Sequence, residues 1–130
     1  MARVALDADL LIAFLDPGDA QHERAIDELR PRLSAGDELL VGATVYAEMI
    51  VRPLQQRADA TVDGFLDAAG VRLVPTDRAI ARRAAQLRVD HRSLRLPDAL
   101  SLATAIVSDA TLLTLDKKLE RIAAQAQRSS

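Results

Sequence analysis

The chain has 130 residues, a length that fits one domain with a sizeable buried core. Its apolar fraction of 49% argues against disorder, and the absence of cysteine excludes disulfides, thiolate zinc sites and a cysteine nucleophile. The net charge of -2 argues against a protein that coats nucleic acid through an overall basic surface. Because no apolar run approaches a membrane span and the first residues lack a signal pattern, we expect a cytoplasmic protein with no membrane association.

The spacing of apolar residues predicts strands and helices that alternate along the chain. We expect strands at 4–6, 39–41, 71–74 and 111–115. Helices are expected over about 9–15, from the turn at 16–19 to about 33, over about 45–54 and 61–69, from 76 or 77, from 97 to about 107, and from 116. A basic loop is expected at 91–95. Strands that are separated by helices pair in parallel through crossover connections. The chain is therefore predicted to form one domain over residues 1–130, a three-layer α/β/α sandwich around a mainly parallel sheet of four or five strands.

Four acidic residues stand in unusual places in this pattern. They are Asp7 at the end of the first strand, Glu48 inside an apolar helix, Asp98 in the first turn of another, and Asp116 after the last strand. Strand ends and the starts of the following helices share one edge of a parallel sheet, so Asp7, Asp98 and Asp116 can converge there. Converging carboxylates repel one another, and a bound cation removes that conflict. Oxygen ligands without histidine or cysteine favour Mg²⁺ or Mn²⁺, which can activate water against a phosphodiester.

Each acid also has a purely structural interpretation. Asp9 or Asp116 can cap the helix that follows it, and Asp98 can complement the positive end of its helix dipole. Glu48 can form an ion pair with Arg52 one helical turn later. Because the structural interpretation needs several coincidences at once, the acids together favour a metal site.

Four short segments, in this order and spacing, carry a resemblance to a known family. They read LDADLLI at residues 6–12, YAEM at 46–49, LPDAL at 96–100 before an alanine-rich helix, and LTLD at 113–116. In these segments the chain resembles the PIN-domain ribonucleases, and among them the VapC-type toxins of toxin–antitoxin pairs, over essentially its whole length.

The resemblance implies a PIN-like fold and assigns roles to particular residues. It implies that Asp7, Glu48, Asp98 and Asp116 are the catalytic and metal-binding acids, with Thr114 as a supporting hydroxyl. It also implies a Mg²⁺- or Mn²⁺-dependent endoribonuclease that cuts RNA and forms a homodimer. A small antitoxin protein would neutralise it by occluding the site.

Two positions depart from the pattern of the family. The family usually has Thr or Ser at the position of Ala8, and Asn or Ser at the position of Asp9. Loss of the hydroxyl at Ala8 removes a possible hydrogen bond to a neighbouring acid. The additional charge of Asp9 either tightens metal binding or caps the helix. These two departures raise an alternative to a nuclease, namely a PIN fold that has lost its activity and only binds a partner. The four retained acids argue against that alternative.

A second alternative is a phosphatase of the haloacid dehalogenase type. The order Asp7-Ala8-Asp9 after an apolar strand imitates the nucleophile motif of that class, but the motif continues with Thr or Val where this chain has Leu11. In such an enzyme Asp9 would be an essential acid/base, whereas in a PIN nuclease it would be supporting.

Arginines are concentrated in the segment that precedes Asp98. They are Arg82, Arg83, Arg88, Arg92 and Arg95. We expect them either to guide an RNA backbone toward the acids through phosphate contacts or to form a solvated helix face.

Overall fold

A parallel β-sheet lies at the centre of the fold. The computed structural model describes residues 2–128. The strands are β1 (Arg3–Leu6), β2 (Glu38–Gly42), β3 (Arg72–Val74) and β4 (Thr111–Leu113). They pair in parallel in the order β3-β2-β1-β4, with Ala5 opposite Leu40 on one side and Leu112 on the other. The predicted parallel sheet is confirmed, with four strands.

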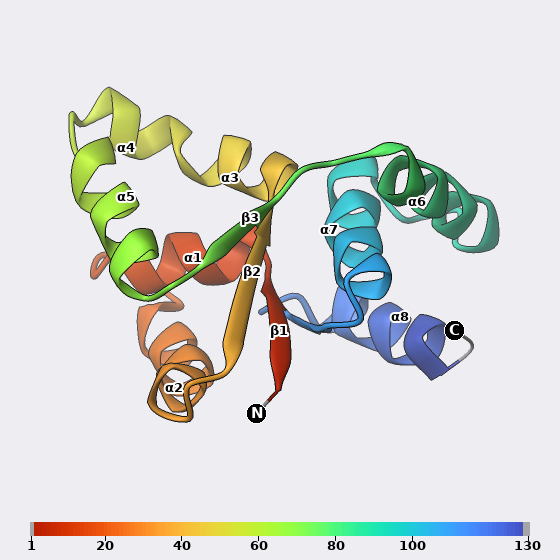
Figure 1. Ribbon diagram of the computed structural model, residues 1–130, viewed down its shortest axis with the longest axis horizontal. Helices are drawn as coiled ribbons and strands as arrows, with labels where there is room; N and C mark the ends of the chain where they lie inside the picture. The colour runs from red at the N-terminus through yellow and green to blue at the C-terminus, as the bar shows by residue number, and fades with distance from the viewer. Residues whose placement is uncertain (1, 129–130) are drawn as a thin grey trace.

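Helices cover both faces of this sheet and complete the predicted three-layer sandwich (Figure 1). One layer contains α1 (Ala8–Leu15), α2 (His22–Ser34), α3 (Ala43–Met49), α4 (Val51–Gln55) and α5 (Asp59–Ala68). The other contains α6 (Arg78–Asp90), α7 (Leu96–Val107) and α8 (Lys117–Arg128). No helix in residues 2–128 combines the length and the apolar character that a membrane crossing requires.

Each face of the sheet has its own hydrophobic core. Val4 and Leu6 of β1 point to the side of α1, α2, α3 and α5, while Ala5 between them points to the side of α6, α7 and α8. In β2, Val41 and Leu40 divide between the two cores in the same way. Because successive side chains of a strand face opposite ways, short apolar runs such as these are buried on both faces.

The helix predicted over residues 45–54 is in fact two helices. Its first part begins earlier than expected, after Gly42. The hydroxyl of Thr44 in its first turn is buried without a hydrogen-bond partner. The break follows Met49, four residues before Pro53. Proline has no N–H and its ring collides with the carbonyl group four residues earlier, which explains why α3 ends there.

The sheet and α7 bring distant parts of the chain to one edge. β1 lies between β2 and β4, and all three strands end at the same edge because they are parallel. The backbone N–H of Asp7 donates to the carbonyl oxygen of Leu113 at 3.0 Å, so strand pairing continues into the next residue. Thr114 and Asp116 follow β4, α3 follows β2, and α7 packs against both β1 and α3. The residues singled out in the sequence therefore meet at this edge.

Candidate active site

Asp7 is the buried centre of the candidate site. Its side chain is only 7% exposed and makes no capping hydrogen bond to α1. Instead its two carboxylate oxygens each accept a hydrogen bond from a buried hydroxyl. The Ser101 hydroxyl donates to Oδ1 at 2.8 Å, and the Thr114 hydroxyl donates to Oδ2 at 2.8 Å. The carboxylate is held in one orientation, and each oxygen keeps a lone pair for another partner.

Thr114 connects Asp7 to two further acids. Its hydroxyl lies 3.3 Å from both carboxylate oxygens of Asp9 and accepts a hydrogen bond from the backbone N–H of Asp116 at 3.2 Å. A hydroxyl has a single proton to donate. Since Asp7 is the nearer acceptor, Asp9 receives only a weak share of that proton.

Asp9 does not cap α1, so the capping interpretation was wrong for this residue. The N-cap is Asp7, and Asp9 is the second residue of the helix. Its half-buried carboxylate turns toward β4, where the backbone N–H of Leu115 lies at 3.4 Å. Burial, followed by the charge of Asp7, raises the pKa of Asp9 to about 6. The additional acid therefore increases the negative charge beside Asp7.

Asp98 is the third residue of α7 and is partly exposed. Its Oδ2 lies 3.6 Å from Nε of Arg95, which forms an ion pair with it. Burial raises the pKa of Asp98; Arg95 opposes that shift, and the charges of Asp7 and Asp116 add to it. Asp98 is thus within electrostatic reach of acids that come from two different strands.

Glu48 lies on α3 and is exposed, yet it interacts with the same acids. Partial desolvation of the carboxylate raises its pKa first, the charges of Asp7 and Asp98 raise it further, and Arg95 opposes the shift. The alternative pairing with Arg52 was wrong, because Nη1 of Arg52 forms its ion pair with Oδ2 of Asp16 at 3.7 Å. Glu48 therefore belongs to the acidic group.

Asp116 has a structural role as well as a charge near the site. Its Oδ1 accepts the backbone N–H groups of Lys118 at 2.9 Å and Leu119 at 3.1 Å, which caps α8 as the structural interpretation expected. The same carboxylate raises the pKa of Asp98. The two interpretations of this residue are compatible.

The donor set suits a hard cation that keeps part of its water shell. Within residues 2–128, no three acidic or imidazole side chains stand close enough together to form a ready-made metal cage. Mg²⁺ does not require one, because it usually keeps several waters and binds through one or two carboxylates. The charge of Asp7 raises the pKa of Asp9, Glu48 and Asp98, and a cation would relieve that repulsion. The residues present therefore fit Mg²⁺ or Mn²⁺.

A small hollow of about 150 Å³ opens beside two of these acids. Asp98 and Asp116 line it together with Arg95, Ser93, Lys118 and three apolar side chains. Cations and carboxylates thus share one cleft. Such a cleft can receive a phosphate group whose charge is balanced partly by the side chains and partly by an ion on the acids.

Ser101 touches Asp7 directly, although nothing in the sequence pattern singled it out. A serine within an apolar helix looks like a small core residue. The available signal was its spacing, since residues three apart lie on the same side of a helix and Ser101 is three residues after Asp98.

The comparisons with known proteins agree with the fold. The sequence profile of the PIN domain family matches residues 4–125. None of the curated proteins matches the sequence.

Several solved structures share the fold. The Mycobacterium tuberculosis toxin VapC20, a sarcin–ricin loop cleaving toxin, matches with a TM-score of 0.70 and 19% identity over 91% of this chain and 93% of that one. A toxin–antitoxin complex from Klebsiella pneumoniae matches with a TM-score of 0.70 and 23% identity over 88% of each chain. FitAcB from Neisseria gonorrhoeae matches with a TM-score of 0.70 and 21% identity over 93% of each chain.

Proposed function

The chain belongs to the PIN domain family, and from that premise we propose that it is a divalent-metal-dependent endoribonuclease, the toxin of a toxin–antitoxin pair. The observation that carries the proposal is the buried carboxylate of Asp7. Two hydroxyls fix its orientation, and its charge acts on Glu48 and Asp98. A structural ion pair would supply a cation to such a group. Here the charged neighbours of Asp7 are further acids, and a bound metal ion would offset the repulsion between their carboxylates.

In the proposed mechanism Asp7 and Asp98 would hold the principal ion, Mg²⁺ or Mn²⁺. Glu48 and Asp116 complete the charge cluster by orienting waters or by helping to hold a second ion. When bound, the ion would polarise the phosphodiester and activate a water for attack. The protein contributes orientation: hydroxyls fix Asp7, and α7 fixes Asp98 in its first turn. Glu48 adds a carboxylate from α3, whose pKa is raised by burial and by the charges of Asp7 and Asp98.

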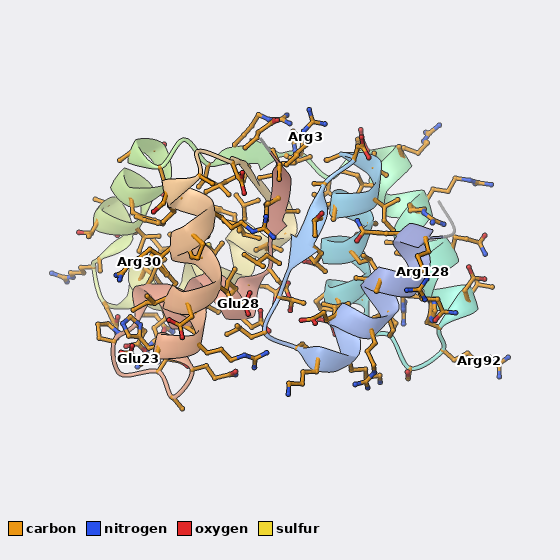
Figure 2. All side chains as sticks on the ribbon, turned by 90° about the horizontal axis from the view of Figure 1, so that it is seen from below. Arg3, Glu23, Glu28, Arg30, Arg92 and Arg128 are labelled. Carbon is orange, nitrogen blue, oxygen red and sulfur yellow. The ribbon has the colours of Figure 1, made fainter. Side chains whose placement is uncertain are left out.

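The charge distribution supports RNA as the substrate. Residues 78–95 contain six arginines and one aspartate, a formal charge of +5 in a chain whose net charge is -2. We call this segment the arginine segment. Arg92 projects from the loop after α6, at the opposite end of the molecule from Arg30 on α2 (Figure 2). Hollows of about 380 and 610 Å³ flank the segment, lined by Arg92 and by Arg82 respectively. An RNA backbone that follows these cations would arrive at Asp98.

We predict that Arg82→Gln with Arg92→Gln weakens RNA binding, because both side chains are exposed and would contact phosphates. Binding is measured by fluorescence anisotropy on the Asp98→Asn protein, which keeps RNA uncut. The slope of log affinity against log salt should decrease by roughly 0.7 for each arginine removed. The control is Arg24→Gln with Arg30→Gln on α2, which makes the same charge change elsewhere. Equal weakening in the two double variants would contradict a local RNA path.

The partner and the cellular setting follow from the same proposal. The Klebsiella pneumoniae structure is a toxin–antitoxin complex, and we propose that this chain likewise binds a small antitoxin that occludes the acids. We also propose a homodimer, and a cytoplasmic location where RNA substrate is available. A short reading frame directly upstream that encodes a DNA-binding protein would support the toxin assignment.

Metal removal tests the proposed chemistry. RNA cleavage by the native chain should require added Mn²⁺ or Mg²⁺ and should stop in excess EDTA. Asp98→Asn should reduce cleavage to the EDTA level, while Asp27→Asn, an exposed acid on α2, should cleave like the native chain. Equal residual cleavage in the native chain and Asp98→Asn would refute the mechanism. A chain that folds and binds an antitoxin but cuts no RNA would identify a non-catalytic module.

A further inference from the structure

Ser101 contributes the second hydrogen bond to the carboxylate of Asp7. It lies inside α7 and is 2% exposed, so its hydroxyl has no access to bulk water. The distance from its Oγ to Oδ1 of Asp7 is 2.8 Å, the same as that from Thr114 to Oδ2. Helix α7 thus supplies an acid, Asp98, and one turn later a hydroxyl that touches another acid.

The two hydroxyls on Asp7 are not equivalent. The single proton of Thr114 has competing acceptors, since both oxygens of Asp9 lie at 3.3 Å from the same hydroxyl. Within residues 2–128, the Ser101 hydroxyl is hydrogen-bonded to Asp7 alone. Ser101 is therefore the donor that Asp9 does not compete for.

We propose that Ser101 is a positioning residue that fixes the carboxylate of Asp7 for metal binding. The inference rests on the proposed function, because it assumes that Asp7 is a metal ligand. The terminal torsion of aspartate is broad, so a carboxylate held at one oxygen can rotate. With Ser101 and Thr114 on different oxygens, the carboxylate plane is set and each oxygen keeps a lone pair for a metal ion. Residues that orient a metal ligand in this way typically change metal affinity about 10- to 100-fold when removed.

A merely structural role would give a different result. Ser101 could serve only to satisfy a buried polar group where α7 packs on β1, in which case its removal would change stability and leave metal affinity unaltered. Thr104 provides the matched comparison. It is 1% exposed on the same helix, and its hydroxyl donates to the carbonyl oxygen of Leu100 at 2.8 Å.

The test measures Mn²⁺ dissociation constants by titration calorimetry, together with urea unfolding in EDTA. Ser101→Ala should weaken Mn²⁺ binding about 10- to 100-fold, and Ser101→Thr should restore most of it because the hydroxyl is kept. Thr104→Val should leave Mn²⁺ affinity within about twofold while removing a buried hydroxyl of the same helix. An unchanged affinity in Ser101→Ala would overturn the proposal.

A double-mutant cycle tests the competition for the Thr114 proton. Asp9→Ala leaves that proton to Asp7, so Ser101→Ala should weaken Mn²⁺ binding less in the Asp9→Ala background than in the native chain. An equal loss in both backgrounds would contradict the assigned competition, and with it the reason for a second donor. Asp7→Asn separates the two proposals. If it leaves Mn²⁺ affinity unchanged, the metal site itself is refuted; if it abolishes binding while Ser101→Ala does not alter it, only the positioning role fails.

Discussion

Asp7→Asn should abolish metal-supported RNA cleavage and leave the fold intact. The amide has the shape of the carboxylate, and its oxygen can accept one of the two hydroxyl hydrogen bonds. Its NH₂ group can donate to the oxygen of the other hydroxyl, so the buried pairings with Ser101 and Thr114 survive. What disappears is the negative charge at the centre of the acidic group. Since removing a group that only orients a metal ligand costs about 10- to 100-fold, loss of the ligand's charge should exceed that range.

Single-turnover cleavage of RNA in saturating Mn²⁺ measures this effect, with urea unfolding in EDTA as the test of folding. Asp7→Asn should unfold at a urea concentration equal to or above that of the native chain, because repulsion with Asp9 and Glu48 is relieved. Asp27→Asn is the control for the loss of one negative charge at a distance. Cleavage by Asp7→Asn within tenfold of the native rate would rule out Asp7 as the principal ligand.

The sequence was sufficient to predict the framework around Asp7. Apolar runs that end in an acid mark strand ends, and parallel strands must end at one sheet edge, so Asp7, Asp98 and Asp116 were expected near one another. The family resemblance added Thr114 to them. The structure places Thr114 directly on Asp7 and joins the backbone of Asp116 to the same hydroxyl. These contacts follow from the parallel arrangement of the strands, which the alternation of apolar runs and helices in the sequence predicts.

Side-chain pairing was less predictable, because it depends on distances between elements. The i,i+4 spacing of Glu48 and Arg52 favoured an ion pair, but Arg52 is bound to Asp16 across the interface with the end of α1. The position of Asp9 after a strand favoured a cap, yet α1 begins one residue earlier and carries Asp9 toward Thr114. A shift of one residue in a helix start was enough to change that role.

The hydroxyl expected to be missing at Ala8 has a counterpart elsewhere. Sequence comparison by position pointed to a lost hydrogen bond beside Asp7, and the structure shows Ser101 donating one from α7. Ser101 is far from Ala8 in the chain and reaches Asp7 through the packing of α7 on β1. Local pattern alone could not predict that contact.

Asp9→Asn should stabilise the metal-free protein at neutral pH and have little effect in acid. Burial and the charge of Asp7 raise the pKa of Asp9 from 3.8 to about 6, so the folded state binds its proton more tightly than the unfolded state. Below about pH 4 both states are protonated and the native chain bears no charge penalty at this residue. As the pH rises through 6, the folded state must ionise Asp9 against Asp7, and the native chain loses stability that the asparagine variant keeps.

The size of the effect follows from the same shift. A difference of about two pKa units corresponds to roughly 3 kcal/mol, and because Asp9 is only half-buried, solvent screening reduces this to about 1 to 2 kcal/mol. Urea unfolding in EDTA at pH 4 and pH 7.5 measures it, and the gain from Asp9→Asn should appear at the higher pH only, whereas Asp27→Asn should show no such pH dependence. A gain of the same size at both pH values would mean that the charge of Asp9 is not its cause. Asp9→Asn also separates two enzyme classes. A haloacid dehalogenase-type phosphatase would lose its acid/base and with it its activity. The proposed nuclease keeps Asp7, Glu48 and Asp98 and should still cut RNA.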